Sequence, residues 1–433
     1  MIRYVLPSVL FMNCLLVGHI GYAQTTSVAG QAEKKKTATD KEPVVKGSYI
    51  QTNKGRTTII QTDNNGLKYR FMLEGEVTIA DDERSITGIT TGGRFEYSRQ
   101  PKGELEHKVI ITPNNNGQLQ GQYWIGDVEK DYAVDGVNWL AQYLPEMVTK
   151  TGIGAAARAE RLFKEGGISK VLSFTATMPA GMGRDRMYRY LLEKETLTAD
   201  EIKALLEQVA KVKTSDHELA RMLTHIPASL VMQSGVAAAY VKASLSISSD
   251  YEKARTLKHL LTFEQLSEST LSEVAKGIST ISSDYEKVGV LLKLASRPQL
   301  LDEQFVFAVK ALEHVSSDYE RAKGLTAFLR HEQQVINNFN TFLPLIKSIG
   351  SDYEKAKVYA KLLDVNGIGA DYYVALLKGS ESIGSDYEKS KLLQKVAKQM
   401  PKENKDVREA YLQTAKTIGS SHEYERAVTI YKQ

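Results

Sequence analysis

The chain has 433 residues, 42% of them hydrophobic and 25% charged, so it is long enough for two or three domains and can bury a sizeable core. Its formal charge is only +4, and its mean hydropathy is −0.30. This balance argues against a dedicated nucleic-acid-binding protein, which would concentrate Lys and Arg in one patch.

The first 23 residues are typical of a signal peptide for export. Arg3 precedes a mostly apolar stretch over residues 5–20, and Gly21 and Ala23 place small residues where a signal peptidase cleaves. An uncleaved membrane anchor is the alternative, although the apolar stretch is short. Both interpretations put the rest of the chain outside the cytoplasm, in the periplasm or the extracellular space. The only cysteine, Cys14, lies inside this signal, so the mature chain would have no disulfide and no cysteine metal site.

The N-terminal third of the chain changes character twice. Residues 24–46 are polar without apolar periodicity, which predicts a flexible linker. Residues 47–134 are rich in short strand patterns separated by Gly and Pro, which predicts a small antiparallel β domain, including one strand over 68–79. The period becomes helical over residues 135–180, where we expect a helical connector broken at Gly166 and Gly167.

The strongest signal is an internal repeat of 34 residues. Ser-Asp-Tyr-Glu occurs five times, with its aspartate at Asp250, Asp284, Asp318, Asp352 and Asp386. A related copy begins at Ser215, and a degenerate copy spans residues 422–427. Two helices per unit cannot bury both faces alone, so stacked copies predict an α-solenoid over residues 181–433. The expected fold class is mostly α, with a small N-terminal β domain.

Each part of the motif predicts a local role. Ser249 and Glu252 have the spacing of a capping box, in which each side chain accepts from the other residue's backbone N–H. Asp250 at the first helical position faces the positive end of the helix dipole. The expected apolar face begins at the motif tyrosine and continues through Ala254, Leu257 and Leu261. The motif tyrosines are therefore predicted to pack in the core.

The repeat resembles the second helix of a tetratricopeptide repeat, within the broader group of tetratricopeptide-like and HEAT-like solenoids. The Trp, Gly and Pro positions of the tetratricopeptide family have no counterparts here, so its peptide groove is not carried over. The chain is more similar to uncharacterised exported bacterial proteins with the same repeat, over most of residues 90–433. The matching stretches are residues 92–97, 123–125, 144–148 and 165–168. In similar chains such a region can follow a membrane metallopeptidase, which this sequence lacks, and the resemblance supplies no catalytic residues.

A search for reactive groups predicts no enzyme, cofactor or metal site. His331 and Glu332 begin like a zinc-peptidase helix, but Val335 stands where the second His would be needed. We expect a solvated helix end there. The histidines do not cluster at ligand spacing, and no phosphate loop or nucleophile elbow is present.

One surface feature suggests a partner. If the motif aspartate is the first position, the sixth and tenth positions share a helix face and are mostly basic. We call them the basic ladder, which comprises Arg221, Arg255, Lys293, Lys323, Lys357, Lys361, Lys391 and Lys395. The alternatives are a docking strip for an acidic partner, either protein or anionic glycan, and an ordinary solvated face neutralised by nearby Glu.

The expected function is non-covalent protein binding in the cell envelope, as a scaffold or sensory accessory, with no nucleic acid and no membrane span after signal removal. Two alternatives remain open from sequence. The β domain could bind a small molecule or glycan around Tyr97, Tyr123 and Trp124, or the chain could be an enzyme with an unrecognised site.

Overall fold

A computed structural model describes residues 48–432, except 54–55, 63–65, 180, 195 and 213–214. The predicted signal peptide and the linker lie outside the described residues. The chain divides into two compact units, Met1–Arg158 and Ala159–Gln433, and each is described by itself. None of the described helices combines the length and apolar character that a bilayer crossing requires.

The first unit contains the predicted antiparallel sheet. Its seven strands run in the order β1-β2-β3-β6-β7-β8-β9. They are β1 (Ser48–Asn53), β2 (Arg56–Thr62), β3 (Lys68–Glu74), β6 (Arg94–Gln100), β7 (His107–Pro113), β8 (Leu119–Ile125) and β9 (Val128–Lys130). The single strand expected over residues 68–79 is wrong, because Gly75 turns the chain at φ 75°. Beyond it, β4 (Val77–Ile79) pairs with β5 (Ile86–Ile89) in a separate hairpin.

Helix α1 (Val137–Thr151) packs against the sheet within the first unit. Trp139 on α1 is buried, and its ring centroid lies 5.5 Å from that of Tyr97 and 5.7 Å from that of Tyr123. The next helix, α2 (Ala155–Thr177), is broken at Gly166 and Gly167, as predicted. The boundary between the units falls inside α2, so the segment expected as a connector contributes to both units.

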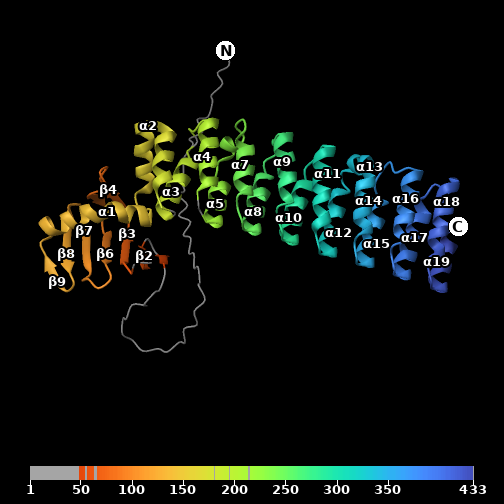
Figure 1. The fold of residues 1–433 in the computed structure, drawn as a ribbon, viewed down its shortest axis with the longest axis horizontal. Coiled ribbons are helices and arrows are strands. Elements are labelled where there is room, and N and C mark those ends of the chain that lie inside the picture. The colour runs from red at the N-terminus through yellow and green to blue at the C-terminus, as the bar shows by residue number, and fades with distance from the viewer. Residues whose placement is uncertain are drawn as a thin grey trace, which may run out of the picture. The chain divides into compact units, whose positions relative to one another are not determined.

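The second unit is a repeat array of paired helices, and the expected fold class is confirmed (Figure 1). One layer holds the motif helices α5 (Asp216–Thr224), α8 (Asp250–Leu260), α10 (Asp284–Ala295), α12 (Asp318–Phe328), α15 (Asp352–Leu362), α17 (Asp386–Gln399) and α19 (Ser421–Lys432). The other holds α4 (Ala199–Lys211), α7 (Val236–Leu245), α9 (Glu268–Ile278), α11 (Asp302–Lys310), α14 (Phe339–Lys347), α16 (Ala370–Ser380) and α18 (Lys405–Lys416). Helix α3 (Met182–Leu192) precedes them, and α6 (Ala228–Val231) and α13 (Glu332–Asn337) are short additions.

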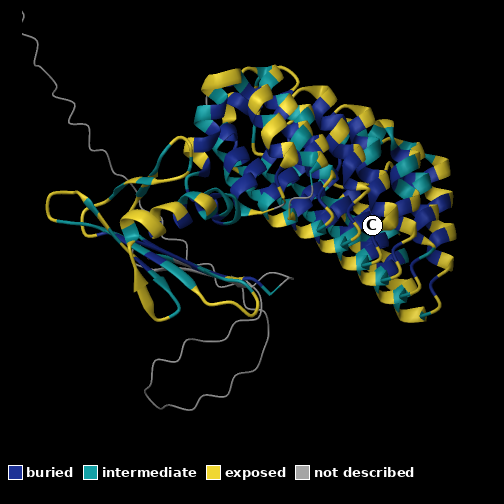
Figure 2. Cartoon of the chain, turned by 60° about the vertical axis from the view of Figure 1, so that its left-hand side comes forward, coloured by how far each residue is buried: buried dark blue, intermediate teal, exposed yellow. Residues whose placement is uncertain are grey.

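The core of the array lies between the two layers, where Figure 2 shows buried residues on the facing sides of the helices. Leu257, Leu291 and Leu325 on the motif helices are completely buried. The residue three places before each motif aspartate is also buried, namely Ile247, Ile281, Val315, Ile349 and Ile383. These positions recur once per unit, so stacking makes one continuous apolar core.

Each motif aspartate bonds to the next repeat. Its carboxylate accepts two backbone N–H groups from the turn that starts the following motif helix, at 2.7 to 3.2 Å. The pairs join Asp216 to Ser248 and Ser249, Asp250 to Ser282 and Ser283, Asp284 to Ser316 and Ser317, Asp318 to Gly350 and Ser351, Asp352 to Gly384 and Ser385, and Asp386 to Gly419 and Ser420. We call this contact the aspartate clamp.

Only half of the predicted capping box forms at Ser249, because the aspartate clamp takes the backbone N–H that Glu252 was expected to bond. The hydroxyl of Ser249 accepts from the N–H of Glu252 at 3.4 Å, as expected. The N–H of Ser249 donates to Asp216 at 2.7 Å, so it is not available to Glu252. The carboxylate of Glu252 pairs instead with Arg255, 3.0 Å away on the same helix.

The fourth motif position makes a second contact between repeats. Lys355 is buried, and its ammonium donates to the carbonyl of Ser382 at 3.0 Å, near the C-terminal end of α16. The same contact is made by Lys253 to Thr280, Lys287 to His314, Arg321 to Ser348 and Lys389 to Thr417. A cation at a helix C-terminus satisfies a carbonyl that the helix leaves free, and it also faces the negative end of the dipole. The aspartate and the lysine of one motif therefore both bond to the turn that precedes the next motif helix. Asp352 accepts from Gly384 and Ser385, and Lys355 donates to Ser382.

Candidate binding surface on the motif helices

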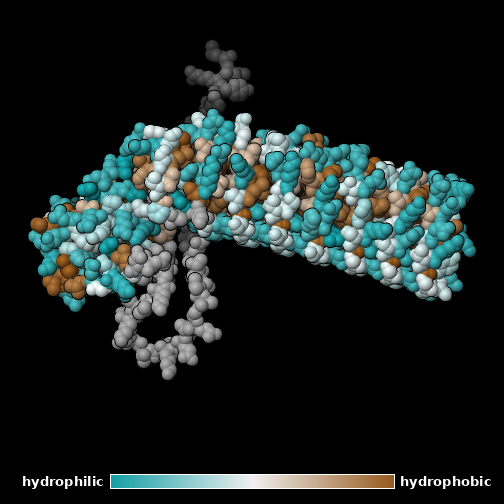
Figure 3. Space-filling view, in the orientation of Figure 1, coloured by the Kyte–Doolittle hydropathy of each residue, from teal (hydrophilic) through white to brown (hydrophobic). Residues whose placement is uncertain are grey.

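The motif tyrosines lie on the surface. Between 51% and 67% of each of these residues is exposed, so the prediction that they pack in the core is wrong. We call them the tyrosine stripe, which consists of Tyr251, Tyr285, Tyr319, Tyr353 and Tyr387. They occur on five successive motif helices that pack side by side. Figure 3 shows that the visible face of the array is mainly hydrophilic, with hydrophobic side chains in the recesses between helices.

Helix geometry explains why tyrosine is excluded from the core. Each residue advances about 100° around an α-helix, so the second motif position lies about 120° away from the buried eighth position. The fourth position lies only about 40° from it, and the stem of Lys253 or Lys287 takes that buried place. A step of three residues falls about 60° short of a full turn, so the two steps from Tyr251 to Ala254 and Leu257 turn the tyrosine about 120° away from the core. The expected apolar face did not include this rotation.

Cations accompany the tyrosine stripe. The ammonium of Lys323 lies 5.9 Å from the ring centroid of Tyr285 and 5.8 Å from that of Tyr319, and therefore joins two motif helices. Lys357 lies 5.8 Å from the ring of Tyr353, and Lys391 lies 6.0 Å from that of Tyr387. These distances are at the outer limit of a cation–π contact, and more than half of each tyrosine remains exposed.

Five cations of the basic ladder pair with carboxylates of the repeat array itself. Arg221, Arg255, Lys323 and Lys357 each pair with the glutamate three residues earlier, at 2.5 to 3.3 Å. Lys395 donates to Asp364 and to the carbonyl of Ala360, so it ties α17 to the end of α15. Among the described residues, Lys293, Lys361 and Lys391 form no ion pair. In the described part of the chain, the ladder therefore contains both paired cations and cations without an ion pair.

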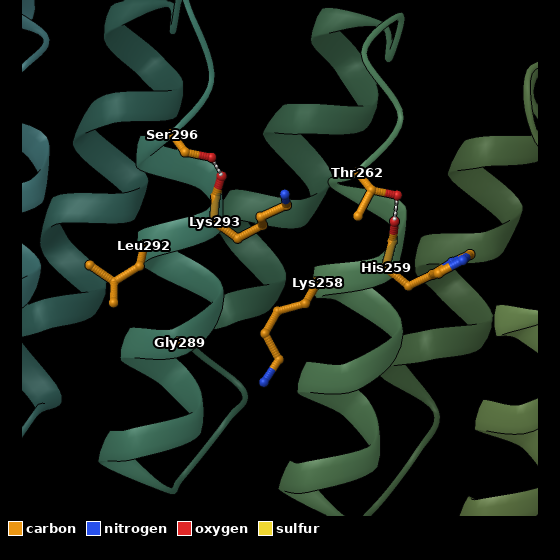
Figure 4. Close-up of a pocket in the computed structure, with 7 residues that line it drawn as sticks. All are labelled: Lys258, His259, Thr262, Gly289, Leu292, Lys293 and Ser296. Carbon is orange, nitrogen blue, oxygen red and sulfur yellow. Dashed lines mark hydrogen bonds between the residues drawn. The ribbon is translucent and has the colours of Figure 1, made fainter.

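A hollow of about 550 Å³ interrupts this surface between α8 and α10 (Figure 4). It lies beside Gly289, the sixth position of α10, where neighbouring motif helices carry Arg or Lys. Lys258 and His259 border it on one side, and Leu292 and Lys293 on the other. Burial lowers the pKa of His259 below its ordinary value, and the nearby His225 and Arg255 act in the same direction.

The aromatic residues proposed for the β domain do not form one open site. Tyr97 and Tyr123 are buried beside Trp139, and the hydroxyl of Tyr123 lies 2.6 Å from Nδ1 of His107. Trp124 is half-buried and lies under the ammonium of Lys108, 4.9 Å from its ring centroid. Helix α1 occupies the space that a ligand beside Tyr97 and Tyr123 would need.

The zinc-peptidase-like sequence has a structural role. His331 is buried rather than solvated, and its Nε2–H donates to the carbonyl of Ala295 at 2.9 Å, which joins two repeats. Glu332 accepts from the side chain of Asn366 at 2.9 Å. Within the described part of the chain, no group of three or more His, Cys, Asp or Glu side chains could hold a metal ion.

The sequence did contain a signal for the tyrosine stripe. One aromatic residue recurs at a position that the helical period turns away from the core leucines, and an angular count along the motif would have found it. No protein-family model matches this chain, and a search of curated proteins finds no significant relative, so the geometry of this surface carries the functional argument.

Proposed function

We propose that this chain is an exported, non-catalytic scaffold or sensory accessory that binds another protein in the cell envelope. The observation that carries the proposal is the tyrosine stripe, five identical and exposed aromatic side chains on successive motif helices. Binding across several repeats suits an extended array of this kind.

The main contacts that stack the repeats do not involve the tyrosine stripe, although Lys323 contacts the rings of Tyr285 and Tyr319 on two neighbouring helices. The aspartate clamp and the buried lysines join one unit to the next, and the leucines fill the core. An exposed tyrosine ring leaves apolar area in contact with water and forgoes the free energy of burying it. The motif nevertheless repeats this residue five times. Tyrosine is enriched at protein–protein interfaces, where its rigid ring contributes contact area and its hydroxyl contributes a hydrogen bond.

The charge on this surface favours an acidic partner. Lys361 and Lys391 are exposed and have no ion pair among the described residues, and Lys357 lies next to Tyr353. Cations at the rim of an interface mainly raise the association rate and select partners of opposite charge. Binding should therefore weaken as ionic strength rises.

Affinity capture from an envelope extract tests this proposal. The bait carries Tyr→Ala at the five stripe positions, and it should lose partners that the unaltered chain captures. A matched bait replaces exposed residues of the other helix layer, Glu303, Lys378 and Gln413, and should capture the same partners as the unaltered chain. A bait carrying Lys361→Glu and Lys391→Glu should lose partners in a salt-dependent way. Identical capture by all four baits would rule out this surface.

A further inference from the structure

The rings of the tyrosine stripe recur at the spacing of packed helices. The motif helices lie side by side (Figure 1), and the same aspartate clamp joins each to the next, so equivalent residues repeat once per helix. The ammonium of Lys323 lies 5.9 Å from the ring centroid of Tyr285 and 5.8 Å from that of Tyr319. The two centroids can be no further apart than the sum of these distances. This limit agrees with the separation of about 8–10 Å that is usual between packed helices.

The hydroxyl groups of the stripe are donors that the protein does not use. Among the described residues, none of the five hydroxyls bonds to another protein group. The buried Tyr411 differs, because its hydroxyl donates to the carbonyl of Ala427 at 3.0 Å. A tyrosine hydroxyl carries one proton to donate, so the stripe offers a partner one donor on each motif helix.

Cations border the rings along the stripe. The second and sixth motif positions share a helix face, and Lys357 lies 5.8 Å from the ring of Tyr353. Two cations lie near the ring of Tyr387, Lys391 from the same helix and Arg426 from α19, each 6.0 Å from its centroid. Several of these cations already pair with a glutamate of their own helix. They therefore favour an acidic partner, but the rings and hydroxyls define the surface.

A partner that crosses the motif helices must present the same face once per helix. A β-strand does so every two residues, or about 6.6 Å, which is too short. An α-helix does so every seven residues, or about 10.5 Å, but its carbonyls are bonded within the helix. A polyproline II helix does so every three residues, or about 9.3 Å, and its backbone makes no internal hydrogen bonds. Only the last conformation matches both the spacing of the rings and the row of donors.

We infer that the tyrosine stripe binds a partner segment in the polyproline II conformation, with a proline against each ring and acidic residues beside the cations. The inference rests on the proposed function and names the conformation and chemistry of the partner. The tyrosine hydroxyls donate to the carbonyls of this segment. Proline-rich segments dock on aromatic surfaces because they are already ordered before binding and lose little conformational entropy.

The test uses the full chain and three fluorescently labelled peptides of equal length and charge. They contain five copies of Pro-Pro-Glu, which forms polyproline II, of Gly-Ser-Glu, which is flexible, or of Ala-Ala-Glu, which favours a helix. Five polyproline II turns span about 45 Å, enough to cross five packed helices. The proline peptide should bind more tightly than either other peptide by on the order of tenfold, because it is preorganised. Added salt should weaken all three and leave the ratios unchanged.

Variants locate the peptide on the stripe. Tyr319→Ala combined with Tyr353→Ala removes two neighbouring rings and should abolish most of the preference for proline. Phe at the same two positions keeps the rings without the hydroxyls, so it should retain an intermediate preference. Tyr424→Ala removes a tyrosine of α19 that is 37% exposed and lies outside the stripe, and it should change nothing. Circular dichroism and thermal unfolding establish that each variant is folded. If the double Ala variant does not fold, the two single Ala variants should each lower the preference.

The outcomes separate this inference from the proposed function. Equal binding of the three peptides, or no binding by any, overturns the polyproline II segment. Tighter binding of the Ala-Ala-Glu peptide overturns it in favour of a helical partner. A preference for proline that survives the double Ala variant places the peptide elsewhere and also overturns it. In each of these cases, capture with the five-tyrosine bait still decides the proposed function. If that bait captures the same partners as the unaltered chain, the proposed function fails whether or not the proline peptide binds.

Discussion

The carboxylate of Asp250 accepts the backbone N–H of Ser283, 33 residues later in the chain, at 2.7 Å. The same oxygen accepts the N–H of Ser282 at 3.0 Å. The aspartate that opens one motif helix therefore fixes the turn that opens the next. In α19 the corresponding residue is Ser421, and Tyr424 replaces the buried lysine, so this helix offers neither contact.

Replacing Asp284 with Ala should destabilise the repeat array by about 1–3 kcal/mol, because the N–H groups of Ser316 and Ser317 lose their shared acceptor. Chemical denaturation followed by far-UV circular dichroism measures the loss. Asp406→Ala is the matched control, since Asp406 is an exposed aspartate in the first turn of α18. It should cost only the dipole contribution of about 0.3–1 kcal/mol. Equal losses in the two variants would contradict the aspartate clamp.

Replacing Lys355 with Ala should destabilise the array by about 2–3 kcal/mol, because the change removes both a buried methylene stem and the donor to Ser382. Lys355→Met keeps most of the stem and should cost about 1 kcal/mol. The same denaturation experiment compares the two. Lys361→Ala, at an exposed position, should change stability by less than about 0.5 kcal/mol. If Ala and Met variants are equally stable, the stem does not contribute.

His331 should make stability depend on pH. Burial lowers its pKa below 6.5, and the charge of Arg330 adds to the effect, while the hydrogen bond to Ala295 opposes it. Below about pH 6.5 the unfolded chain takes up a proton that the native imidazole resists, so the stabilising contribution is lost as pH falls. The unfolding free energy of the unaltered chain, relative to His331→Gln, should therefore shrink between about pH 7.5 and pH 5. A constant or growing difference would contradict this assignment.

The pair formed by Glu83 and Arg158 should stabilise the first unit. Arg158 is 3% exposed and Glu83 is 13% exposed, and two nitrogens of the guanidinium donate to the carboxylate. A double-mutant cycle with Glu83→Gln and Arg158→Met should give a coupling of about 1–3 kcal/mol. Both tryptophans of the chain, Trp124 and Trp139, lie in this unit, so their fluorescence follows its unfolding separately from the array. A coupling near zero would show that the pair contributes nothing to stability.

Much of the array could be predicted from the sequence because its rules are local. The motif serine places each helix start, and the apolar residue three places before each motif aspartate is buried as its spacing indicates. The break at Gly166 and Gly167 followed from glycine chemistry, and Gly167 adopts φ 63°. These outcomes depend on neighbours within a few residues, which a single sequence displays directly.

The candidate site was predicted less well. The basic ladder and its neighbouring glutamates were found from their spacing, but the partner of Lys395 was not, because it is Asp364 in the turn that follows another helix, α15. The motif tyrosine was assigned to the core, and the buried lysine two residues later was not recognised. In the β domain, burial of Tyr97 and Tyr123 depends on Trp139, which belongs to a helix rather than to the sheet.

The sequence by itself determined the period, the helix starts and the apolar stripe of this protein, because backbone geometry and capping act over one or two turns. Only the tertiary structure decided which polar groups meet, since the bonds from Asp250 and Lys253 span 27 to 33 residues and exist only when one hairpin lies on the next. Stacking placed the aspartates and lysines between repeats and left the tyrosines exposed to solvent, which is why the candidate binding surface emerged from the fold.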